Sequence, residues 1–399
     1  MSLFYKIVQW MLVLPALQNI RILFYFYDSL ILRFLPKPER KAGKKKVLVV
    51  FPLSLGDAVM FYGTIPYLLQ MYPKEEYDVV LTCHEEYREL FREQFSGIIP
   101  IDYRRASVDL RYRAVFLRKM RRTYYDIAVD PVGSEKCSPN LYAMNAVCAG
   151  LKVGVLSETA QKYQCPAWLR KSVYDILLAQ KKDVHKVQYY AKVCSLLGGK
   201  ACRPAVAKLP VGSCMALPKK YFIVYPSASV PVKMWPVERF AEIAERIWRE
   251  KNWSLVVCGR EQDRLVTERL LRLIPKKMPV CNLIAKTTVM QLLEVVGRAA
   301  LVLTNDTSVY HIAVGTGRKT CVVSGGYVYD QFLDYLSNGY ETEAEICIAA
   351  HKSDCMNCNN HCIKRVEGVY PCVLANTVDE VWEKVRILIA EKTKETEKD

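Results

Sequence analysis

The segment LVLTNDTSVYHIAVGTG, residues 301–317, has the residue types of an anion-binding turn. Its apolar start predicts a buried strand, and the spacing of apolar residues after Ser308 is typical of an amphipathic helix. Hydroxyl, amide and carboxyl side chains lie between the two. A helix that begins there leaves unpaired backbone N–H groups at the carboxyl end of the strand, where phosphate is a common ligand. The segment therefore predicts an α/β enzyme that binds a phosphorylated compound.

A second polar turn, PSASVPVKMWP, follows the predicted strand Tyr221–Tyr225. Its small hydroxyl residues, Ser227 and Ser229, and the cation of Lys233 are of the types that hold a diphosphate together with backbone N–H groups. Lys233 as an ordinary loop lysine is the alternative. After the next predicted strand come Glu261 and Asp263, and a carboxylate in that position often binds ribose hydroxyls. Both acids also suit the first turn of a helix.

In the first half of the chain, the predicted strand VLVVF leads into PLSLGDAVMF. Gly56 allows a tight turn, and we expect Asp57 to open the following helix, where a role as its N-cap is the alternative to a functional one. The pair comes at the carboxyl end of the first strand, where open α/β sheets bind their ligands. The fingerprint G-x-G-x-x-G is absent, which argues against a nicotinamide or flavin enzyme.

Two further clusters carry charge or metal-binding groups. The segment 103–122 is strongly basic, and it is either a solvated helix face or a site for a phosphorylated or acidic glycolipid. The cysteines of DCMNCNNHCIKRVEGVYPC have the spacing of a structural zinc or iron–sulfur site, with unligated thiols or disulfides as the alternative. The acceptor candidates are Gly56, Arg104, Arg105, Arg118, Arg121 and Arg122, and the metal candidates are Cys355, Cys358, Cys362 and Cys372, with His351, His361 and Cys347 as spare ligands.

The rest of the chain must position these residues. From Val47 onward, short β-rich runs alternate with helical periodicity, pause in a Gly/Pro-spaced region and then resume, which predicts two parallel sheets with helices on both faces. The predicted strands are residues 47–51, 78–82, 126–130, 152–155, 221–225, 254–258, 280–284, 301–304 and 320–324. We expect an N-terminal Rossmann-like domain over residues 46–200, a linker over 201–219 and a C-terminal domain over 220–399 with a Cys-rich loop at 347–372.

Residues 1–45 differ from all that follows. An apolar stretch with few charges is followed by a basic cluster, which is what a helix lying in an anionic membrane surface requires. The uncharged run is shorter than a spanning helix needs, and no cleavage site of a secretory signal follows it. The alternative is a helix packed on this protein or on a partner. The basic residues are Arg33, Lys37, Arg40, Lys41, Lys44, Lys45 and Lys46.

The composition of the chain limits the classes of partner and the location that we expect. The chain of 399 residues has a net charge of +16, which indicates an anionic partner. Nucleic acid is not expected, because no reader motif and no interleaved recognition aromatics accompany the charge. Most of the 15 cysteines lie singly in apolar runs, which favours a reducing, cytoplasmic location.

The polar turns carry a resemblance to a known family. The segments PSASVPVKMWPVERFAEIA, CGREQD and NLIAKTTVMQLLEVVGRAALVLTNDTSVYHIAVGTG resemble the C-terminal half of the family-9 glycosyltransferases, the heptosyltransferases of lipopolysaccharide core synthesis and their relatives. VLVVFPLSLGDAVMFYGTIPYLLQMYP looks like the opening of the same family. The match runs from about Lys46 to Gly326. It implies the GT-B fold, in which two Rossmann-like domains face a cleft.

The resemblance also implies roles for single residues. Asp57 matches the family's catalytic base and Lys233 its diphosphate-binding lysine. Either Glu261 or Asp263 matches the ribose-binding acid. Because Asp306 is anionic, it suits a sugar hydroxyl, the helix cap or a loosely held cation better than a phosphate. The donor-phosphate and sugar contacts match Asp306 and Thr307, with Ser308 at the helix start and His311 one turn on, although His311 also reads as an ordinary core histidine.

The resemblance implies inverting transfer of a heptose-like sugar from a nucleoside diphosphate, commonly ADP-heptose, to a lipopolysaccharide core or other lipid-linked glycan. No cofactor is expected, apart from a divalent cation at the donor or a structural zinc as possible additions. We expect a peripheral protein on the cytoplasmic face of the inner membrane. PSASVPVKMWP and GGYVYDQFLDY depart from the common pattern. A non-catalytic nucleotide-sugar-binding homologue, and a transferase of another sugar in capsule or O-antigen synthesis, are therefore the alternatives.

Overall fold

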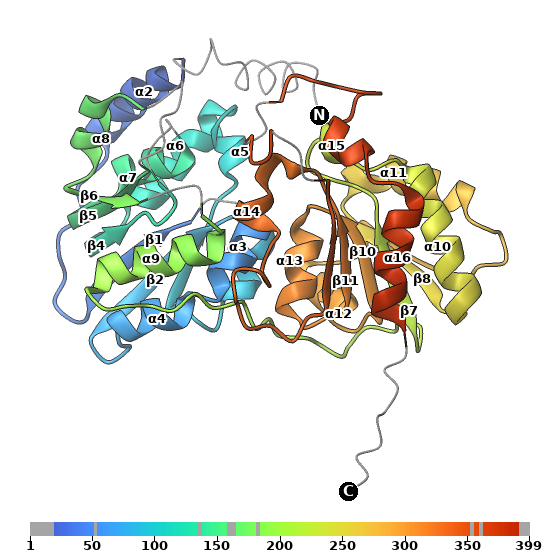
Figure 1. Cartoon of the computed structure of the whole chain (residues 1–399). Coiled ribbons are helices and arrows are strands. Elements are labelled where there is room, and N and C mark those ends of the chain that lie inside the picture. The colour runs from blue at the N-terminus through green and yellow to red at the C-terminus, as the bar shows by residue number, and fades with distance from the viewer. Residues whose placement is uncertain are drawn as a thin grey trace, which may run out of the picture. The chain divides into compact units, whose positions relative to one another are not determined.

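The computed structural model describes residues 20–51, 54–133, 138–157, 165–180, 184–351, 355–358 and 362–390 (Figure 1). The chain divides into two compact units. The N-terminal unit comprises Met1–Ala58 and Thr64–Pro204, and the C-terminal unit comprises Val59–Gly63 and Ala205–Asp399. Each unit has its own sheet and its own hydrophobic core.

The N-terminal unit is built on a six-stranded parallel sheet with the order β3-β2-β1-β4-β5-β6. Four residues in a row of β1 are fully buried, as expected for a central strand covered on both faces. The strands are β1 (Lys45–Val50), β2 (Tyr77–Cys83), β3 (Gly97–Pro100), β4 (Tyr124–Val129), β5 (Cys148–Ser157) and β6 (Ile176–Gln180).

The helices of this unit connect the parallel strands, as parallel pairing requires. Two helices connect β1 to β2, and Pro66 lies in the first turn of the second, a position that suits proline. The helices are α2 (Ile20–Phe34), α3 (Leu55–Tyr62), α4 (Ile65–Met71), the 3₁₀ helix η2 (Glu85–Phe91), α5 (Tyr103–Ala106), α6 (Leu110–Arg121), α7 (Pro139–Ala146), α8 (Ala167–Val173) and α9 (Lys186–Gly198).

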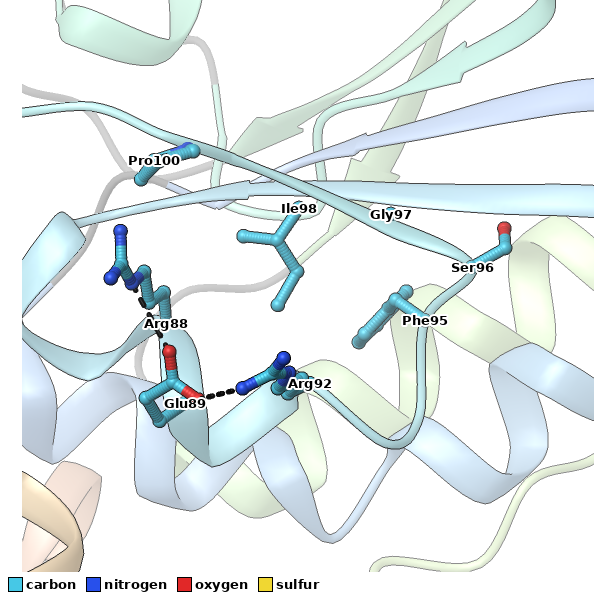
Figure 2. A pocket seen from close by; sticks show the side chains of 8 residues that line it. All are labelled: Arg88, Glu89, Arg92, Phe95, Ser96, Gly97, Ile98 and Pro100. Atoms are coloured by element: carbon cyan, nitrogen blue, oxygen red, sulfur yellow. Dashed lines mark hydrogen bonds and ion pairs between the residues drawn. The ribbon is translucent and has the colours of Figure 1, made fainter.

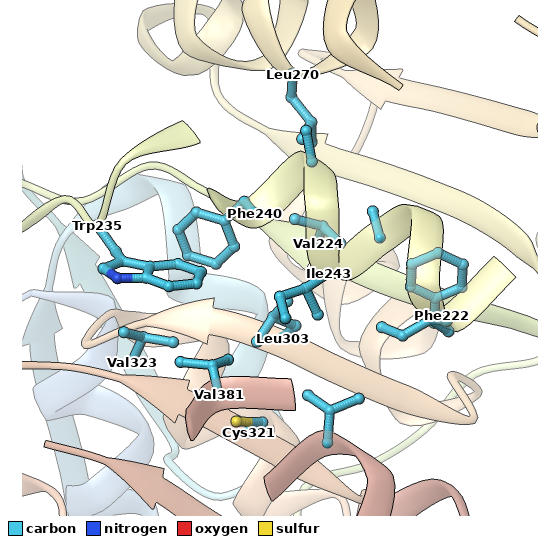
Figure 3. Close-up of a cluster of buried hydrophobic side chains, with 14 of the residues drawn as sticks. Phe222, Val224, Trp235, Phe240, Ile243, Leu270, Leu303, Cys321, Val323 and Val381 are labelled. Carbon is cyan, nitrogen blue, oxygen red and sulfur yellow. The ribbon is translucent and has the colours of Figure 1, made fainter. Parts of the chain in front are cut away.

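The C-terminal unit repeats the design with the strand order β12-β11-β10-β7-β8-β9, again all parallel. Its core joins the sheet to the covering helices, and Figure 3 shows Trp235 and Phe240 beside Leu303 and Val323. The strands are β7 (Tyr221–Tyr225), β8 (Ser254–Gly259), β9 (Val280–Ile284), β10 (Leu301–Asn305), β11 (Thr320–Val323) and β12 (Ile346–Ala349).

Amphipathic helices cover this sheet. In α10 the apolar residues recur every three or four positions and are buried, while the residues between them are charged, which is the pattern of a surface helix. The helices are η3 (Pro231–Lys233), α10 (Val237–Lys251), η4 (Glu261–Asp263), α11 (Arg264–Leu273), α12 (Val289–Gly297), α13 (Ser308–Gly315), η5 (Gly326–Val328), α14 (Tyr329–Phe332), α15 (Pro371–Leu374) and α16 (Val378–Ile389).

The predicted fold class is confirmed, since two parallel α/β sheets are present. Three strands were not predicted, namely β3, β6 and β12, and all three lie at an edge of their sheet. The three strands are only four or five residues long, and a short apolar run cannot be assigned to a strand by periodicity alone.

The first described helix, α2, agrees with the helical arm expected near the N-terminus, although residues 1–19 lie outside the described part of the chain. No helix among the described residues is long and apolar enough to cross a membrane. The described cysteines form no disulfides. Of the six single cysteines that we expected to be buried from their apolar surroundings, four are buried, namely Cys83, Cys194, Cys258 and Cys321, whereas Cys148 and Cys281 are only partly buried.

Candidate functional site

In the C-terminal unit, one buried amide holds the turn that follows β7. The Asn305 side chain at the end of β10 donates from Nδ2 to the carbonyl oxygen of Pro226 at 2.8 Å. Its Oδ1 accepts from the backbone N–H of Trp235 at 3.0 Å. Both ends of this second polar turn, residues 226–235, are therefore tied to β10, the strand that carries the first polar turn. Asn305 was not singled out from the sequence, because its partners lie about 70 residues away.

Lys233 and Asp306 meet where these two polar turns come together. The Lys233 Nζ lies 3.7 Å from Asp306 Oδ2 and 4.5 Å from the centroid of the Tyr327 ring. The side chains of Lys233 and Asp306 are 15% and 8% exposed, so the pair is largely shielded from water. The Tyr327 hydroxyl is hydrogen-bonded to Asp306 and accepts from Ser324 Oγ at 3.2 Å.

Tyr327 is therefore a part of the site that the sequence did not reveal. Its ring faces the Lys233 ammonium, a favourable cation–π contact, and its hydroxyl orients the carboxylate that Lys233 neutralises. Burial, with the charge of Asp306 as a further cause, raises the pKa of Tyr327 well above its ordinary value, so the hydroxyl stays protonated and can donate.

The start of α13 follows Asp306 directly. Thr307 is the N-cap, and its Oγ1 accepts from the N–H of Val309 at 3.3 Å and lies 3.1 Å from Thr304 Oγ1. Ser308 is the first helical residue. The structure thus places backbone N–H groups of a helix start beside the ammonium of Lys233, an arrangement that favours negative charge.

The two acids after β8 have different surroundings. Asp263 is 3% exposed, and its oxygens accept from Ser227 Oγ at 2.6 Å, the Tyr225 hydroxyl at 3.0 Å and the N–H of Arg260 at 2.8 Å. Glu261 is exposed and pairs with Arg264 at 2.6 Å, whose hydrogen bonds lower the pKa of Glu261. Asp263 therefore holds Ser227 and the turn in place through hydrogen bonds, whereas the side chain of Glu261 is exposed at the surface. Ser229, in the same turn, is exposed.

His311 lies inside the unit rather than at its surface. It is 4% exposed, its Nδ1 lies 2.9 Å from the Tyr335 hydroxyl, and the rings of Tyr310 and Phe332 flank it. Burial lowers the pKa of His311 to about 3. These surroundings are those of a core histidine that is neutral at physiological pH.

The burial of His311 predicts an acid-dependent loss of stability. The unfolded state binds a proton near the ordinary histidine pKa of 6.5, while the folded state resists protonation until about pH 3. The stability is therefore fully present above pH 6.5 and falls as the pH drops through this window, by up to about 1.4 kcal/mol per pH unit. His311→Gln should flatten the slope of unfolding free energy against pH between 6 and 4, measured by urea titration. An unchanged slope would show that His311 is not buried in this way.

In the N-terminal unit, Asp57 lies in the first turn of α3 and not at its N-cap, so the alternative role as its N-cap was wrong. The helix begins earlier, at Leu55, and the buried Gly56 is inside it. The Ser54 hydroxyl donates to Asp57 Oδ2 at 2.7 Å. The carboxylate is partly exposed, and its charge contributes to the raised pKa values of the buried phenols Tyr87 and Tyr190, for which burial is the main cause.

The structure divides the basic segment 103–122 between two places. Arg104 and Arg105 belong to α5, which follows the carboxyl end of β3, the same edge of the parallel sheet from which α3 starts. Arg105 pairs with Asp109 at 3.2 Å, and Arg104 is exposed. The remaining candidates, Arg118, Arg121 and Arg122, lie in and just after the last turn of α6, which leads into the amino end of β4.

The cysteine-rich loop contacts the core of the C-terminal unit through Cys358, Cys362 and Cys372. Burial raises the pKa of Cys372, and the nearby thiols of Cys355 and Cys358 raise it further. The described residues include no group of three or more possible ligands arranged to hold a metal ion; His361 lies outside them. A structural metal at this loop stays a prediction that metal analysis of the protein would test.

The N-terminal unit also has a pocket of about 380 Å³ between η2 and the edge strand β3 (Figure 2). Its two arginines, Arg88 and Arg92, both pair with Glu89 at 3.2 Å. None of the site residues predicted from the sequence lines it, so it takes no part in the candidate site.

Together, these features define the class of the protein. Two Rossmann-like units, one carrying an anion-binding corner and the other a carboxylate at the carboxyl edge of its sheet, are the parts of a GT-B enzyme. The model of glycosyltransferase family 9 (heptosyltransferase) matches residues 113–325, more than half of the chain. The chain belongs to this family and is a glycosyltransferase.

Individual relatives agree with this assignment. The lipooligosaccharide heptosyltransferase 2 of Haemophilus ducreyi is 24% identical over 292 residues, which cover 70% of this chain and 82% of the relative. A family-9 glycosyltransferase structure from Veillonella parvula matches with a TM-score of 0.65 at 16% identity, covering 88% of this chain and 98% of that one. The ADP-heptose lipopolysaccharide heptosyltransferase II of Escherichia coli matches with a TM-score of 0.62 at 16% identity, covering 86% and 98%. The structural matches establish the fold.

Proposed function

We propose that this glycosyltransferase transfers a heptose or heptose-like sugar from a nucleoside diphosphate donor, most simply ADP-heptose, to a lipopolysaccharide core or another lipid-linked glycan, with inversion at the anomeric carbon. The observation that carries the proposal is the corner formed by Lys233, Asp306 and the start of α13. It combines a shielded cation with helix N–H groups. Because the chain belongs to this glycosyltransferase family, the anionic ligand that we propose for the corner is a sugar nucleotide.

On the donor side, the reaction needs positive charge and N–H donors beside the diphosphate that leaves. Lys233 and the N–H groups at Thr307 and Ser308 supply both, and because they are fixed before the bond breaks, they stabilise the charge as it develops. Asp306 pairs with Lys233 at 3.7 Å and, when the donor binds, accepts from a sugar hydroxyl. The exposed Glu261 is our choice for the ribose contact, since Asp263 is buried and holds Ser227 and Tyr225.

The acceptor half needs a base. Asp57 takes the proton from the acceptor hydroxyl as the oxygen attacks the anomeric carbon, and the bond from that carbon to the diphosphate oxygen breaks on the opposite face. Ser54 donates to one oxygen of Asp57 at 2.7 Å and so orients the carboxylate. Arg104 and Arg105 lie on the same edge of the sheet and suit the phosphates of an acidic glycolipid.

A lipid-linked acceptor places the enzyme at a membrane. The net charge of +16 and the basic segment after α2 support a peripheral position on the cytoplasmic face of the inner membrane, where the lipid surface is anionic.

Donor binding is tested by a thermal-shift screen of nucleotide sugars, because a ligand that binds only the folded state stabilises it by mass action. ADP-heptose at one hundred times its Kd should add about 2.7 kcal/mol of stability. Lys233→Ala should weaken this binding by roughly 10- to 100-fold, the value of a charge-assisted hydrogen bond. Lys276→Ala, at an exposed lysine of the same unit, is the matched control.

The melting temperature of each variant is measured first without ligand, since Lys233→Ala also leaves Asp306 without its cation. Stabilisation of the wild type by no nucleotide sugar, or equal stabilisation of the wild type and Lys233→Ala, would contradict the donor site.

A further inference from the structure

Helix α2 presents two different faces. One face is packed on the N-terminal unit, with Asp28 and Leu32 buried and Phe24 and Tyr25 partly buried against its core. The other face is apolar and yet exposed. Its residues are spaced three or four apart, so they form a continuous line along the helix, which we name the apolar stripe: Leu23 (62% exposed), Phe26 (56%), Leu30 (59%) and Phe34 (79%).

A buried ion pair fixes the orientation of α2. Arg113 of α6 donates from Nε and Nη2 to the two oxygens of Asp28, at 2.6 and 2.5 Å. Its guanidinium lies over the rings of Phe24 and Tyr142, 4.4 and 4.6 Å from their centroids. Because an unpaired buried charge is costly, the helix cannot rotate to bury the stripe without breaking this pair.

An exposed aromatic residue and basic residues lie around the apolar stripe. Helix α8 lies beside α2 (Figure 1). Its Trp168 is 51% exposed, and the ring centroid of Trp168 lies 6.3 Å from that of Phe26. Exposed basic residues flank the apolar area, namely Arg33 and Lys37 at the C-terminal end of α2 and Lys171 of α8. An apolar face with an aromatic residue and a basic margin has the chemistry of a helix that lies in an anionic membrane interface.

We infer that the apolar stripe, together with Trp168, inserts into the headgroup region of an anionic bilayer and docks the N-terminal unit on it. The inference rests on the proposed membrane location and names the surface responsible. A second copy of the chain is a poorer occupant, because a symmetric contact would set the basic margin against itself.

The same arginine ties this surface to the proposed acceptor side chains. Arg113 also donates to the carbonyl oxygen of Ala106, at the end of α5, at 3.1 Å. Helix α5 carries Arg104 and Arg105. A bilayer bound at α2 therefore lies against the same rigid part of the unit that would receive a lipid-linked glycan.

Vesicle flotation of the full-length protein tests the inference. The wild type should bind vesicles of phosphatidylethanolamine with phosphatidylglycerol and bind poorly to phosphatidylcholine alone. The triple variant Phe26→Ser/Leu30→Ser/Phe34→Ser should lower the partition coefficient by roughly 100-fold, because three apolar side chains no longer leave water. Arg33→Glu/Lys37→Glu should lower it by roughly 10-fold or more, and only with the anionic vesicles.

Matched controls lie in the C-terminal unit. Leu265→Ser/Ile387→Ser removes two apolar residues that are 80% and 67% exposed, and Arg272→Glu/Lys276→Glu reverses two exposed charges. Both should bind vesicles like the wild type. Donor stabilisation should be unchanged in every variant, so a failure of membrane docking is distinguishable from a failure of the donor site.

Three results would overturn the inference. The first is unchanged vesicle binding by the triple variant. The second is a wild-type dimer in sedimentation that this variant converts to a monomer, since the stripe would then be a contact between copies. The third is a clear fall in the melting temperature of the triple variant, which would mean that another part of the chain covers the stripe.

Discussion

Asp57→Asn is expected to lower kcat by about 10²- to 10⁴-fold, the usual contribution of a positioned general base. The carboxamide has nearly the same shape as the carboxylate but cannot take a proton from the acceptor hydroxyl. Donor binding should be retained, since the donor corner lies in the other unit. Steady-state transfer assays and the donor thermal shift of the same preparation separate the two effects.

Asp78→Asn is a suitable control, because Asp78 is a half-exposed aspartate in β2 of the same unit and has no proposed role. It should leave kcat within twofold of the wild type. Full turnover by Asp57→Asn would remove Asp57 as the base.

Arg113→Met is expected to destabilise the N-terminal unit by about 3–5 kcal/mol. Arg113 is 2% exposed and Asp28 is fully buried, so the substitution leaves a carboxylate without a partner in the core. Burial already raises the pKa of Asp28, against the opposing effect of Arg113. Urea unfolding, followed by far-UV circular dichroism, should show the loss.

The double variant Asp28→Leu/Arg113→Met should recover most of this stability, because replacing both members of a buried pair with apolar residues is often neutral or better. Arg246→Met is the matched control. Arg246 pairs with Glu242 and Asp379 at the surface, and exposed pairs of this kind contribute about 0–1 kcal/mol. Equal effects of Arg113→Met and Arg246→Met would contradict the role of the buried pair.

The sequence predicts the central strands and the polar turns well, because each depends on local patterns. VLVVF and YFIVY are apolar runs typical of buried strands, and both form buried strands in the structure. The strands β3, β6 and β12 were not predicted, because runs of four or five apolar residues do not distinguish a strand from a buried helix or loop. The alternative N-cap role of Asp57 was wrong because α3 starts at Leu55, two residues before it.

Other features depend on contacts between distant residues. Asn305 reaches the loop 226–235 from the neighbouring strand, and Tyr327 meets Asp306 across the sheet edge. The choice between Glu261 and Asp263 was open on spacing alone. Our proposal of Glu261 depends on the bonds that Asp263 makes to Ser227 and Tyr225, which no local pattern predicts. The separation of the two ends of the basic segment 103–122 also depends on the tertiary structure. Helix α5 follows the carboxyl end of β3, whereas the last turn of α6 leads into the amino end of β4.

Acceptor-dependent release of ADP from ADP-heptose is the measurement that tests the proposed transfer most directly. The purified full-length protein is mixed with the donor and with a lipopolysaccharide-core glycolipid in anionic vesicles, and ADP and the extended glycolipid are quantified together. We predict equal amounts of both products from the wild type, and a loss of both in Asp57→Asn and Lys233→Ala. Donor binding without either product, across a panel of nucleotide sugars and lipid-linked glycans, would contradict the proposed transfer and favour a binding protein.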